Sequence, residues 1–249
     1  MGVESLQQQN FKDILSRMSA VEGWEIFEAD NLLALKSPAS LPLVNFVWGE
    51  VSSERLRQVK EFFGANEFYW LLSDEQNQLI PIDLKQFFSS AEIFSEMNLD
   101  LNSFSAEVNS DHITILQAKT EHELQMWTET AIATFGFAES YFKEFFYPLI
   151  KYAECIPLLL YYDQKPAATA MLYCGDSVAG VYAMSTKAEF RRKGLGSAAI
   201  NVCVTLARQQ QLEHVVLYAS EDGEFLYSKL GFKSSRIWHE YYFAADFKI

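Results

Sequence analysis

The sequence lacks the features of an exported or membrane-bound protein. It has three cysteines, Cys155, Cys174 and Cys203, and no two of them form a C-x-x-C pair. An odd number at wide spacing predicts reduced thiols in a cytosolic protein. No apolar run approaches the roughly 18 residues that span a bilayer. The opening residues MGVESLQQQN are polar, unlike a secretory signal, and Leu6 stands where a myristoylation signal needs Ser or Thr. We therefore expect a cytoplasmic protein without membrane contact.

Metal-ligand spacing and an excess of positive charge are also missing. The four histidines are scattered at His112, His122, His214 and His239. Their spacing matches no common metal site, so we expect no metal. The formal net charge is −13, of which residues 1–110 (17 acids, 7 bases) contribute −10 and residues 111–249 (16 acids, 13 bases) contribute −3. Such a chain is a poor partner for nucleic acid, whose phosphates need neutralising. Its acidity would attract amines, although an acidic surface also serves solubility alone.

The composition is that of a globular protein with a substantial core. Hydrophobic residues make up 49% of the chain and aromatic residues 15%, and a length of 249 residues suggests one or two domains. Residues 98–111 (NLDLNSFSAEVNSD) are polar and show no hydrophobic pattern. We therefore predict an N-terminal domain over residues 1–110 and a C-terminal domain over residues 111–249.

Hydrophobic periodicity and capping residues predict the elements of each half. In the N-terminal half we expect helices at 11–21, 54–63 and 84–97, and strands at 24–29, 32–36, 45–49 and 68–72. In the C-terminal half we expect strands at 112–117, 156–162, 167–173, 178–186, 214–219 and 241–243, and helices at 121–134, 139–151, 197–210 and 221–230. The order β-α-α-β-β-β-α-β-α-β predicts an α/β (α+β) fold, with a mixed, mostly antiparallel central sheet flanked by helices.

The most informative segment lies between the predicted strand 178–186 and the predicted helix 197–210. It reads Arg191-Arg192-Lys193-Gly194-Leu195-Gly196-Ser197. The glycines let the backbone turn tightly and approach a ligand. Amides at a helix N-terminus bind phosphate oxygens, and the three basic side chains add positive charge beside them. The segment therefore predicts a diphosphate site, although its spacing fits neither a P-loop nor the dinucleotide fingerprint.

Two motifs in order carry a resemblance to a known family. Arg191-x-x-Gly194-x-Gly196 resembles the [QR]-x-x-G-x-[GA] motif of the GNAT superfamily of acyl-CoA-dependent N-acyltransferases. About 30 residues further on, 227–232 (YSKLGF) resembles a second block of that family, Y-x-K-L-G-F. The resemblance covers residues 111–249. Residues 23–72, with the stretch NFVWGEVSSERLRQVKEFFG, are similar to the N-terminal portion of double-domain members. That half has no R-x-x-G-x-G segment, so we expect a degenerate GNAT-like half that binds no CoA.

The resemblance implies an N-acetyltransferase that uses acetyl-CoA and a GNAT-like fold. A small amine or a protein amino group would attack the thioester directly within a ternary complex. Whether the protein forms a homodimer is left open. The implied residues fall into three groups. The strand residues Met184, Ser185 and Thr186 would offer backbone groups to the pantetheine arm. Residues 191–197, comprising Arg191, Arg192, Lys193, Gly194, Leu195, Gly196 and Ser197, would hold the pyrophosphate. Tyr227 would lie near the cofactor sulfur and donate a hydrogen bond to the departing thiolate or protonate it.

Some parts of the mechanism stay open at this stage. Many relatives carry Asn on the segment before the tyrosine, whereas this chain reads SEDGE at residues 220–224. No general base is evident: Glu139, Glu144 and Tyr182 are positioned for the role, and water is the other choice. Two alternative functions also stay open. One is a non-catalytic acyl-CoA-binding or regulatory module with a GNAT fold, and the other is an O-acyltransferase or an enzyme for longer acyl chains.

Overall fold

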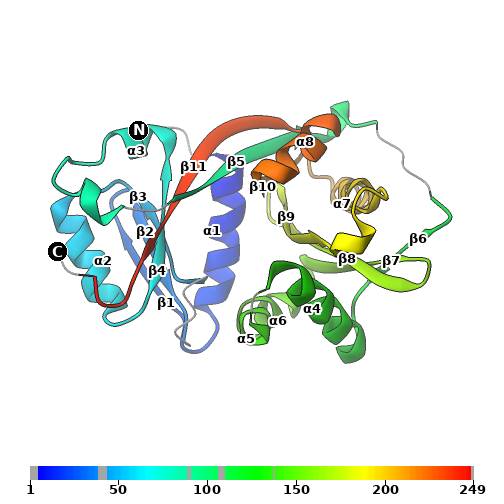
Figure 1. The fold of residues 1–249 in the computed structure, drawn as a ribbon, viewed down its shortest axis with the longest axis horizontal. Helices are drawn as coiled ribbons and strands as arrows, with labels where there is room; N and C mark the ends of the chain where they lie inside the picture. Colours follow the sequence, from blue (N-terminus) through cyan, green and yellow to red (C-terminus); the bar gives the residue numbers. More distant parts are fainter. Residues whose placement is uncertain (1–4, 39–43, 89–90, 106–109, 137, 248–249) are drawn as a thin grey trace. The chain divides into compact units, whose positions relative to one another are not determined.

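The chain folds into two compact units, each built from two separate stretches of sequence. The computed structural model describes residues 5–38, 44–88, 91–105, 110–136 and 138–247 (Figure 1). Unit 1 comprises Met1–Ile14 and Met97–Ser234, and unit 2 comprises Leu15–Glu96 and Ser235–Ile249. The polar segment 98–111 includes residues 106–109, which lie outside the described residues, and the domain boundary at residue 110 stays a prediction.

Unit 1 is a mixed sheet with helices on both faces. Its strands follow the order β5-β10-β9-β8-β7-β6, in which β6 to β9 pair antiparallel and β9 pairs parallel with β10. Helices α4, α5 and α6 cover one face and α7 covers the other (Figure 1). The elements are β5 (Ala91–Asp100), η3 (Leu101–Ser103), β6 (Ile113–Gln117), α4 (Glu121–Phe135), α5 (Glu139–Tyr141), η4 (Phe142–Phe146), α6 (Tyr147–Ile150), β7 (Cys155–Tyr162), β8 (Lys165–Cys174), β9 (Ala179–Thr186), η5 (Ala188–Phe190), α7 (Leu195–Gln209), β10 (His214–Ala219) and α8 (Glu221–Lys229).

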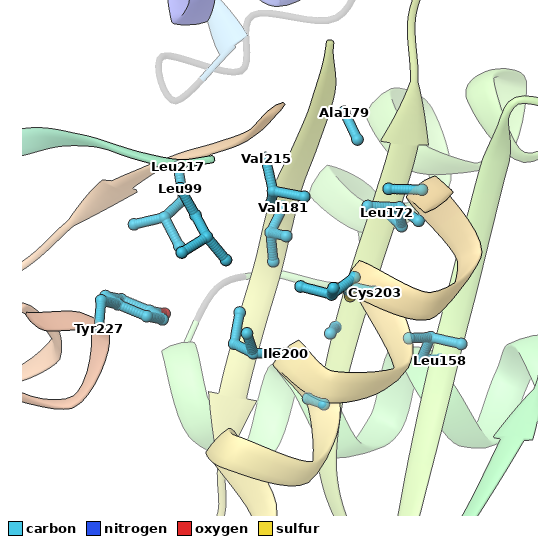
Figure 2. Close-up of a cluster of buried hydrophobic side chains, with 14 of the residues drawn as sticks. Leu99, Leu158, Leu172, Ala179, Val181, Ile200, Cys203, Val215, Leu217 and Tyr227 are labelled. Atoms are coloured by element: carbon cyan, nitrogen blue, oxygen red, sulfur yellow. The ribbon is translucent and has the colours of Figure 1, made fainter. Parts of the chain in front are cut away.

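The core of unit 1 lies between α7 and the sheet. Figure 2 shows Ile200 and Cys203 of α7 directed toward side chains of the strands, which include Leu158 of β7 and Leu172 of β8. Ile200 and Cys203 are fully buried. Burial of an aliphatic side chain contributes roughly 1.5–3 kcal/mol, so this apolar face holds α7 on the sheet. The N-terminus of α7, which carries the predicted diphosphate segment, is thereby fixed against β9.

Unit 2 contains a smaller sheet in the order β1-β2-β3-β4-β11. Strands β3 and β4 are parallel and are joined through α2, which repeats the connection from β9 through α7 to β10 in unit 1. Its core is rich in aromatic rings, with Phe68 stacked between Phe63 and Phe243. The elements are β1 (Glu25–Ala29), β2 (Leu32–Lys36), β3 (Phe46–Gly49), α2 (Ser53–Phe63), β4 (Phe68–Ser73), α3 (Asp74–Gln78), η2 (Lys85–Phe87) and β11 (Lys233–Phe243); α1 (Leu6–Ser19) extends from unit 1 into this unit.

The structure confirms the predicted fold class, a mixed and mostly antiparallel sheet with helices, but it corrects one element. The helix predicted at 84–97 is wrong: η2 is a single turn, and β5 is a strand. Met97 and Leu99 are both 1% exposed, and their alternation is the period of a strand. The helix predicted at 139–151 forms over residues 139–150, with a π-helical segment at its centre. Within the described ranges, no helix combines the length and apolar character of a membrane span.

Candidate functional site

Strands β9 and β10 separate soon after they begin. Their parallel pairing consists of Ala179 with Val215 and Gly180 with Val216. Beyond Gly180, residues 181–186 of β9 pair with β8 on one side, and on the β10 side they pair with no strand of the described chain. The predicted Met184, Ser185 and Thr186 all lie in this divergent stretch. Backbone groups of an unpaired strand edge can bind an extended ligand as an added strand would.

A bulge in β9 shapes this edge. The pairing of β8 with β9 shifts register between Thr169 and Met171, and Ala183 takes a positive φ of 47°. The Thr169 hydroxyl donates to the Ala183 carbonyl oxygen at 2.9 Å and lies 2.8 Å from the Ser185 hydroxyl. Ser185 is 6% exposed, and its hydroxyl is held inside the protein by Thr169. Bulges of this kind re-aim the groups around them and are common next to active sites.

The predicted diphosphate segment forms a tight turn into α7. Gly194 is the N-cap of the helix, with φ 85° and ψ 0°, a left-handed conformation that glycine adopts without steric cost. Arg192 before it also has a positive φ, of 62°. The first hydrogen bond of the helix runs from the Ala198 amide to the Gly194 carbonyl oxygen, at 2.9 Å. The amides of residues 195–197 therefore have no partner within the helix, and no side chain caps them. These are the orphan donors that bind anions at helix N-termini.

The three basic side chains of the segment are exposed and differ in their contacts. The Arg191 guanidinium donates from Nε to the Thr186 carbonyl oxygen at 3.3 Å, which ties the turn to the end of β9. Lys193 Nζ lies 4.6 Å from the ring centroid of Tyr162 and 5.2 Å from that of Phe190. Arg192 makes no hydrogen bond or ion pair within the described ranges, so its guanidinium is free to turn toward an anion.

Gly196 brings three elements together. A Cβ at this position would lie 2.6 Å from Leu226 Cδ2 of α8 and 3.5 Å from Met184 Cε of β9. Helix α7 therefore approaches α8 so closely that a side chain at Gly196 would force Leu226 to move. Leu195 is 1% exposed and packs in the core of unit 1. Met184, Gly196 and Leu226, which are far apart in sequence, thus lie together where β9 and β10 diverge.

Tyr227 lies at the edge of this region with its ring in the core of unit 1. It is 8% exposed, and its ring centroid is 5.7 Å from that of Phe232. Figure 2 shows the phenol projecting from α8 toward α7 and β9. Burial raises the pKa of Tyr227 well above its usual value, and the nearby Cys203 thiol raises it further. A phenol with this pKa stays protonated and acts as a hydrogen-bond donor. Ser220 occupies the N-cap of α8, but its side chain makes no cap bond.

The three base candidates have different environments. Glu139 forms an exposed ion pair with Lys143 at 2.7 Å. The Tyr182 hydroxyl donates to Asn10 Oδ1 at 2.6 Å, and burial raises its pKa well above the usual value, which disfavours the phenolate that a base requires. Glu144 lies on the π-helical segment, and its Oε2 is buried without a hydrogen-bond partner in the described chain. Of the three, Glu144 is the one with a buried carboxylate oxygen that no donor in the described chain satisfies.

Two residues of this region were missed by the motif reasoning. Thr169 supports the bulge, and its only sequence signal is a polar residue within an apolar strand. Asn10 of α1 binds Tyr182 across 172 positions of sequence. Its signal in the sequence is the polar spacing of Gln7, Asn10 and Asp13 along α1. Within the described ranges, no three His, Cys, Asp or Glu side chains gather as a metal site would require.

Comparison with known proteins agrees with this geometry. Residues 122–232 match the model of the acetyltransferase (GNAT) family. The whole fold is similar to a GCN5-related N-acetyltransferase from Kribbella flavida, with a TM-score of 0.70 and 16% identity over 97% of this chain and 96% of that one. A GCN5-related N-acetyltransferase from Sphaerobacter thermophilus gives a TM-score of 0.69 and 10% identity over 99% and 91% of the two chains. A search of curated proteins found no match.

These findings have different weight. At such low identities the two structural likenesses show the fold alone. Each of them extends over nearly all of this chain, which is consistent with a double-GNAT arrangement. The family assignment rests on residues 122–232, which contain both of the motifs that carry the resemblance.

Proposed function

Because residues 122–232 belong to the GNAT acetyltransferase family, we propose that this protein is an N-acetyltransferase that moves an acetyl group from acetyl-CoA to an amine. The observation that carries the proposal is the turn at Gly194. A left-handed glycine N-cap leaves the amides of residues 195–197 uncapped, directly after Arg191, Arg192 and Lys193. Uncapped amides beside basic side chains favour the binding of a diphosphate.

The residues around this turn fit the rest of the cofactor. The amides of residues 195–197 would bind the pyrophosphate, and Arg192 is free to neutralise its charge. The unpaired edge of β9 at Met184, Ser185 and Thr186 would bind the amide groups of the pantetheine arm. The bulge at Ala183, supported by Thr169, would end this edge next to the thioester.

The chemistry is an attack by an uncharged amine on the thioester carbonyl carbon. Bound acetyl-CoA supplies a thioester, whose C–S bond breaks as the new C–N bond forms, and the amine proton ends on the thiol. An alkylammonium near pKa 10.4 must first lose a proton, for which we assign Glu144 or water. The buried Tyr227 would donate a hydrogen bond to the developing thiolate. Its raised pKa makes full proton transfer less favourable than that hydrogen bond.

Unit 2 repeats the strand-helix-strand connection without the features of the turn. The N-cap of α2 is Ser52, whose side chain accepts from the Arg55 amide at 3.1 Å. One of the first-turn amides is therefore already satisfied, whereas the N-cap glycine of α7 has no side chain to satisfy one. We propose that unit 1 alone binds acetyl-CoA.

The test is a calorimetric titration of acetyl-CoA into the full chain, followed by a thiol-release assay over a panel of amines. We expect saturable binding of one acetyl-CoA per chain and amine-dependent release of CoA. Binding without thiol release for any amine would replace the enzyme with a non-catalytic acyl-CoA-binding module. If a folded protein shows no binding, the cofactor assignment is wrong.

A further inference from the structure

The bulge of β9 holds one residue in an unfavourable backbone conformation. Ala183 and Met184 of β9 together oppose the single residue Ala170 of β8. Ala183 adopts a φ of 47°, and a positive φ is sterically unfavourable for residues that have a Cβ. Such a conformation persists only where surrounding contacts hold it, and it is common at active sites. The contacts that hold Ala183 therefore bear on the proposed reaction region.

Two of these contacts hold β8 and the far end of the bulge. The Thr169 hydroxyl binds the Ala183 carbonyl oxygen and the Ser185 hydroxyl. Ala170 has no partner in β9, and its carbonyl oxygen accepts from Trp127 Nε1 of α4 at 3.1 Å. The Trp127 side chain is fully buried, so α4 supports the bulge from within the core of the protein. The near end of the bulge, where β9 enters it, needs a separate anchor.

Helix α1 supplies this anchor through Tyr182, the residue directly before Ala183. The Tyr182 hydroxyl donates to Asn10 Oδ1 at 2.6 Å and accepts from Gln7 Nε2 at 3.5 Å. Asn10 Nδ2 in turn donates to the Val178 carbonyl oxygen at 2.7 Å. Gln7 and Asn10 are both buried. One side chain of α1 therefore joins Val178, directly before β9, to Tyr182, across the segment in which β9 leaves β10.

The surroundings of Asn10 admit an amide in one orientation. Its Nδ2 must face the Val178 carbonyl oxygen, which accepts only, and this leaves Oδ1 for the Tyr182 hydroxyl. Burial raises the pKa of Tyr182 well above its usual value, so the hydroxyl stays protonated and keeps donating. A Cβ at Gly180 would collide with Asn10 Oδ1 and lie 2.6 Å from Tyr182 Cε2. Glycine at that position therefore leaves room for both side chains.

We propose that Asn10 is a positioning residue, which acts through the Tyr182 hydroxyl to hold the start of the β9 bulge and thereby orients the backbone at Ala183 toward the thioester. Without this anchor, Ala183 can leave its unfavourable conformation and β9 can move toward regular pairing with β8. The diphosphate turn at residues 191–197 is a separate element, so acetyl-CoA should still bind. The effect on the reaction rests on the proposed acetyltransferase function, whereas the anchoring of the bulge does not.

Hydrogen exchange of the full chain without ligand, measured by mass spectrometry, tests the anchor itself. Asn10→Leu removes both bonds of the amide, and Tyr182→Phe removes the hydroxyl alone. Both variants should exchange at least about tenfold faster than wild type in peptides that cover residues 181–186, with wild-type rates in the peptides of α7. Gln9→Leu replaces an exposed amide of the same helix and should change nothing. Wild-type exchange at 181–186, or equal acceleration throughout unit 1, would overturn the inference.

Thiol-release kinetics with the best amine of the panel test the consequence for the reaction. Both variants should lower kcat about 10- to 100-fold and leave KM for acetyl-CoA within about twofold of wild type, because small misplacements of the reacting groups have effects of this size. The double variant should lose no more than Asn10→Leu alone, since the hydroxyl acts through Asn10. An unchanged kcat, a matching loss of acetyl-CoA affinity, or additive losses in the double variant would overturn the positioning role.

The exchange measurement separates this inference from the proposed function. If wild type binds no acetyl-CoA or releases no thiol with any amine, the enzyme assignment fails and the exchange rates still decide the anchor. Faster exchange confined to residues 181–186 would then keep Asn10 as the support of the bulge, and unchanged exchange would remove it.

Discussion

The left-handed N-cap at Gly194 allows a sharp test of the cofactor site. In Gly194→Gln the new side chain must adopt φ 85°, which costs about 1–2 kcal/mol of folding free energy for an L-residue. For a chain of this length that lowers the melting temperature by several degrees. Gly194→Glu carries the same strain and nearly the same bulk, but adds a negative charge beside the uncapped amides. Comparison of the two variants therefore isolates electrostatics from geometry.

The magnitude follows from Coulomb's law. A carboxylate roughly 6 Å from a phosphate charge, at an effective dielectric constant of about 20, is repelled by about 3 kcal/mol. Each 1.4 kcal/mol, approximately, is a tenfold change in affinity, so Gly194→Glu should bind acetyl-CoA at least about 100-fold more weakly than Gly194→Gln. Calorimetry at low salt measures the difference, and melting curves check that both variants fold. Equal affinities for the two variants would refute a diphosphate at this turn.

Three further predictions follow from the contacts of the site and of unit 2. Tyr227→Phe should lower the rate of thiol release about 100-fold with acetyl-CoA affinity unchanged, because it removes a donor needed only in the transition state; an unchanged rate would remove Tyr227 from the mechanism. Thr169→Val should destabilise unit 1 by about 1–3 kcal/mol and weaken acetyl-CoA binding, because it leaves the Ala183 carbonyl oxygen and the Ser185 hydroxyl without their partner. Thr169→Ser, which keeps the hydroxyl, should restore both stability and binding. Normal binding by the valine variant would show that the hydroxyl does not support the bulge. Burial, together with the charge of Glu92, raises the pKa of Glu240 from 4.5 to about 7. The folded state then binds the proton more tightly than the unfolded state, so Glu240 contributes stability below about pH 4.5 that is lost as the pH rises through 7, of the order of 3 kcal/mol. Denaturant unfolding should show this loss in wild type and not in Glu240→Gln, and parallel pH profiles for the two would contradict the raised pKa.

Local signals in the sequence were accurate where they depend on hydrogen bonds within a few residues. Thr120 and Glu123 have the spacing of a capping box and form one at the start of α4, with both reciprocal bonds present. Ser52 caps α2 and Gly64 ends it, which agrees with the helix predicted at 54–63. A tight turn at Gly194 was also expected from its glycines, although the helix begins at Leu195 and not at residue 197 as predicted. Such features need no knowledge of the rest of the fold.

The prediction of a helix at 84–97 failed because contacts with distant residues, and not local signals, decide the structure of this segment. The segment contains apolar residues at helical spacing, and Glu and Met in it favour a helix. It becomes a strand because Met97 and Leu99 pack in the core of unit 1, a partner that the segment itself does not reveal. The environment of Tyr227 was equally hidden. Its motif indicated a residue near the cofactor, whereas the burial that raises its pKa comes from α7 and Phe232.

The sequence by itself indicated the resemblance to the GNAT family, the order of most elements and the glycine turn at residue 194, since each is encoded in short, contiguous stretches. Only the tertiary structure decided how the reaction region is built. The bulge at Ala183 depends on a hydroxyl 14 residues away, and Tyr182 depends on Asn10 at a separation of 172 residues. Such contacts form only when packing brings distant segments together, because the free energy that holds them comes from the shared core rather than from either segment.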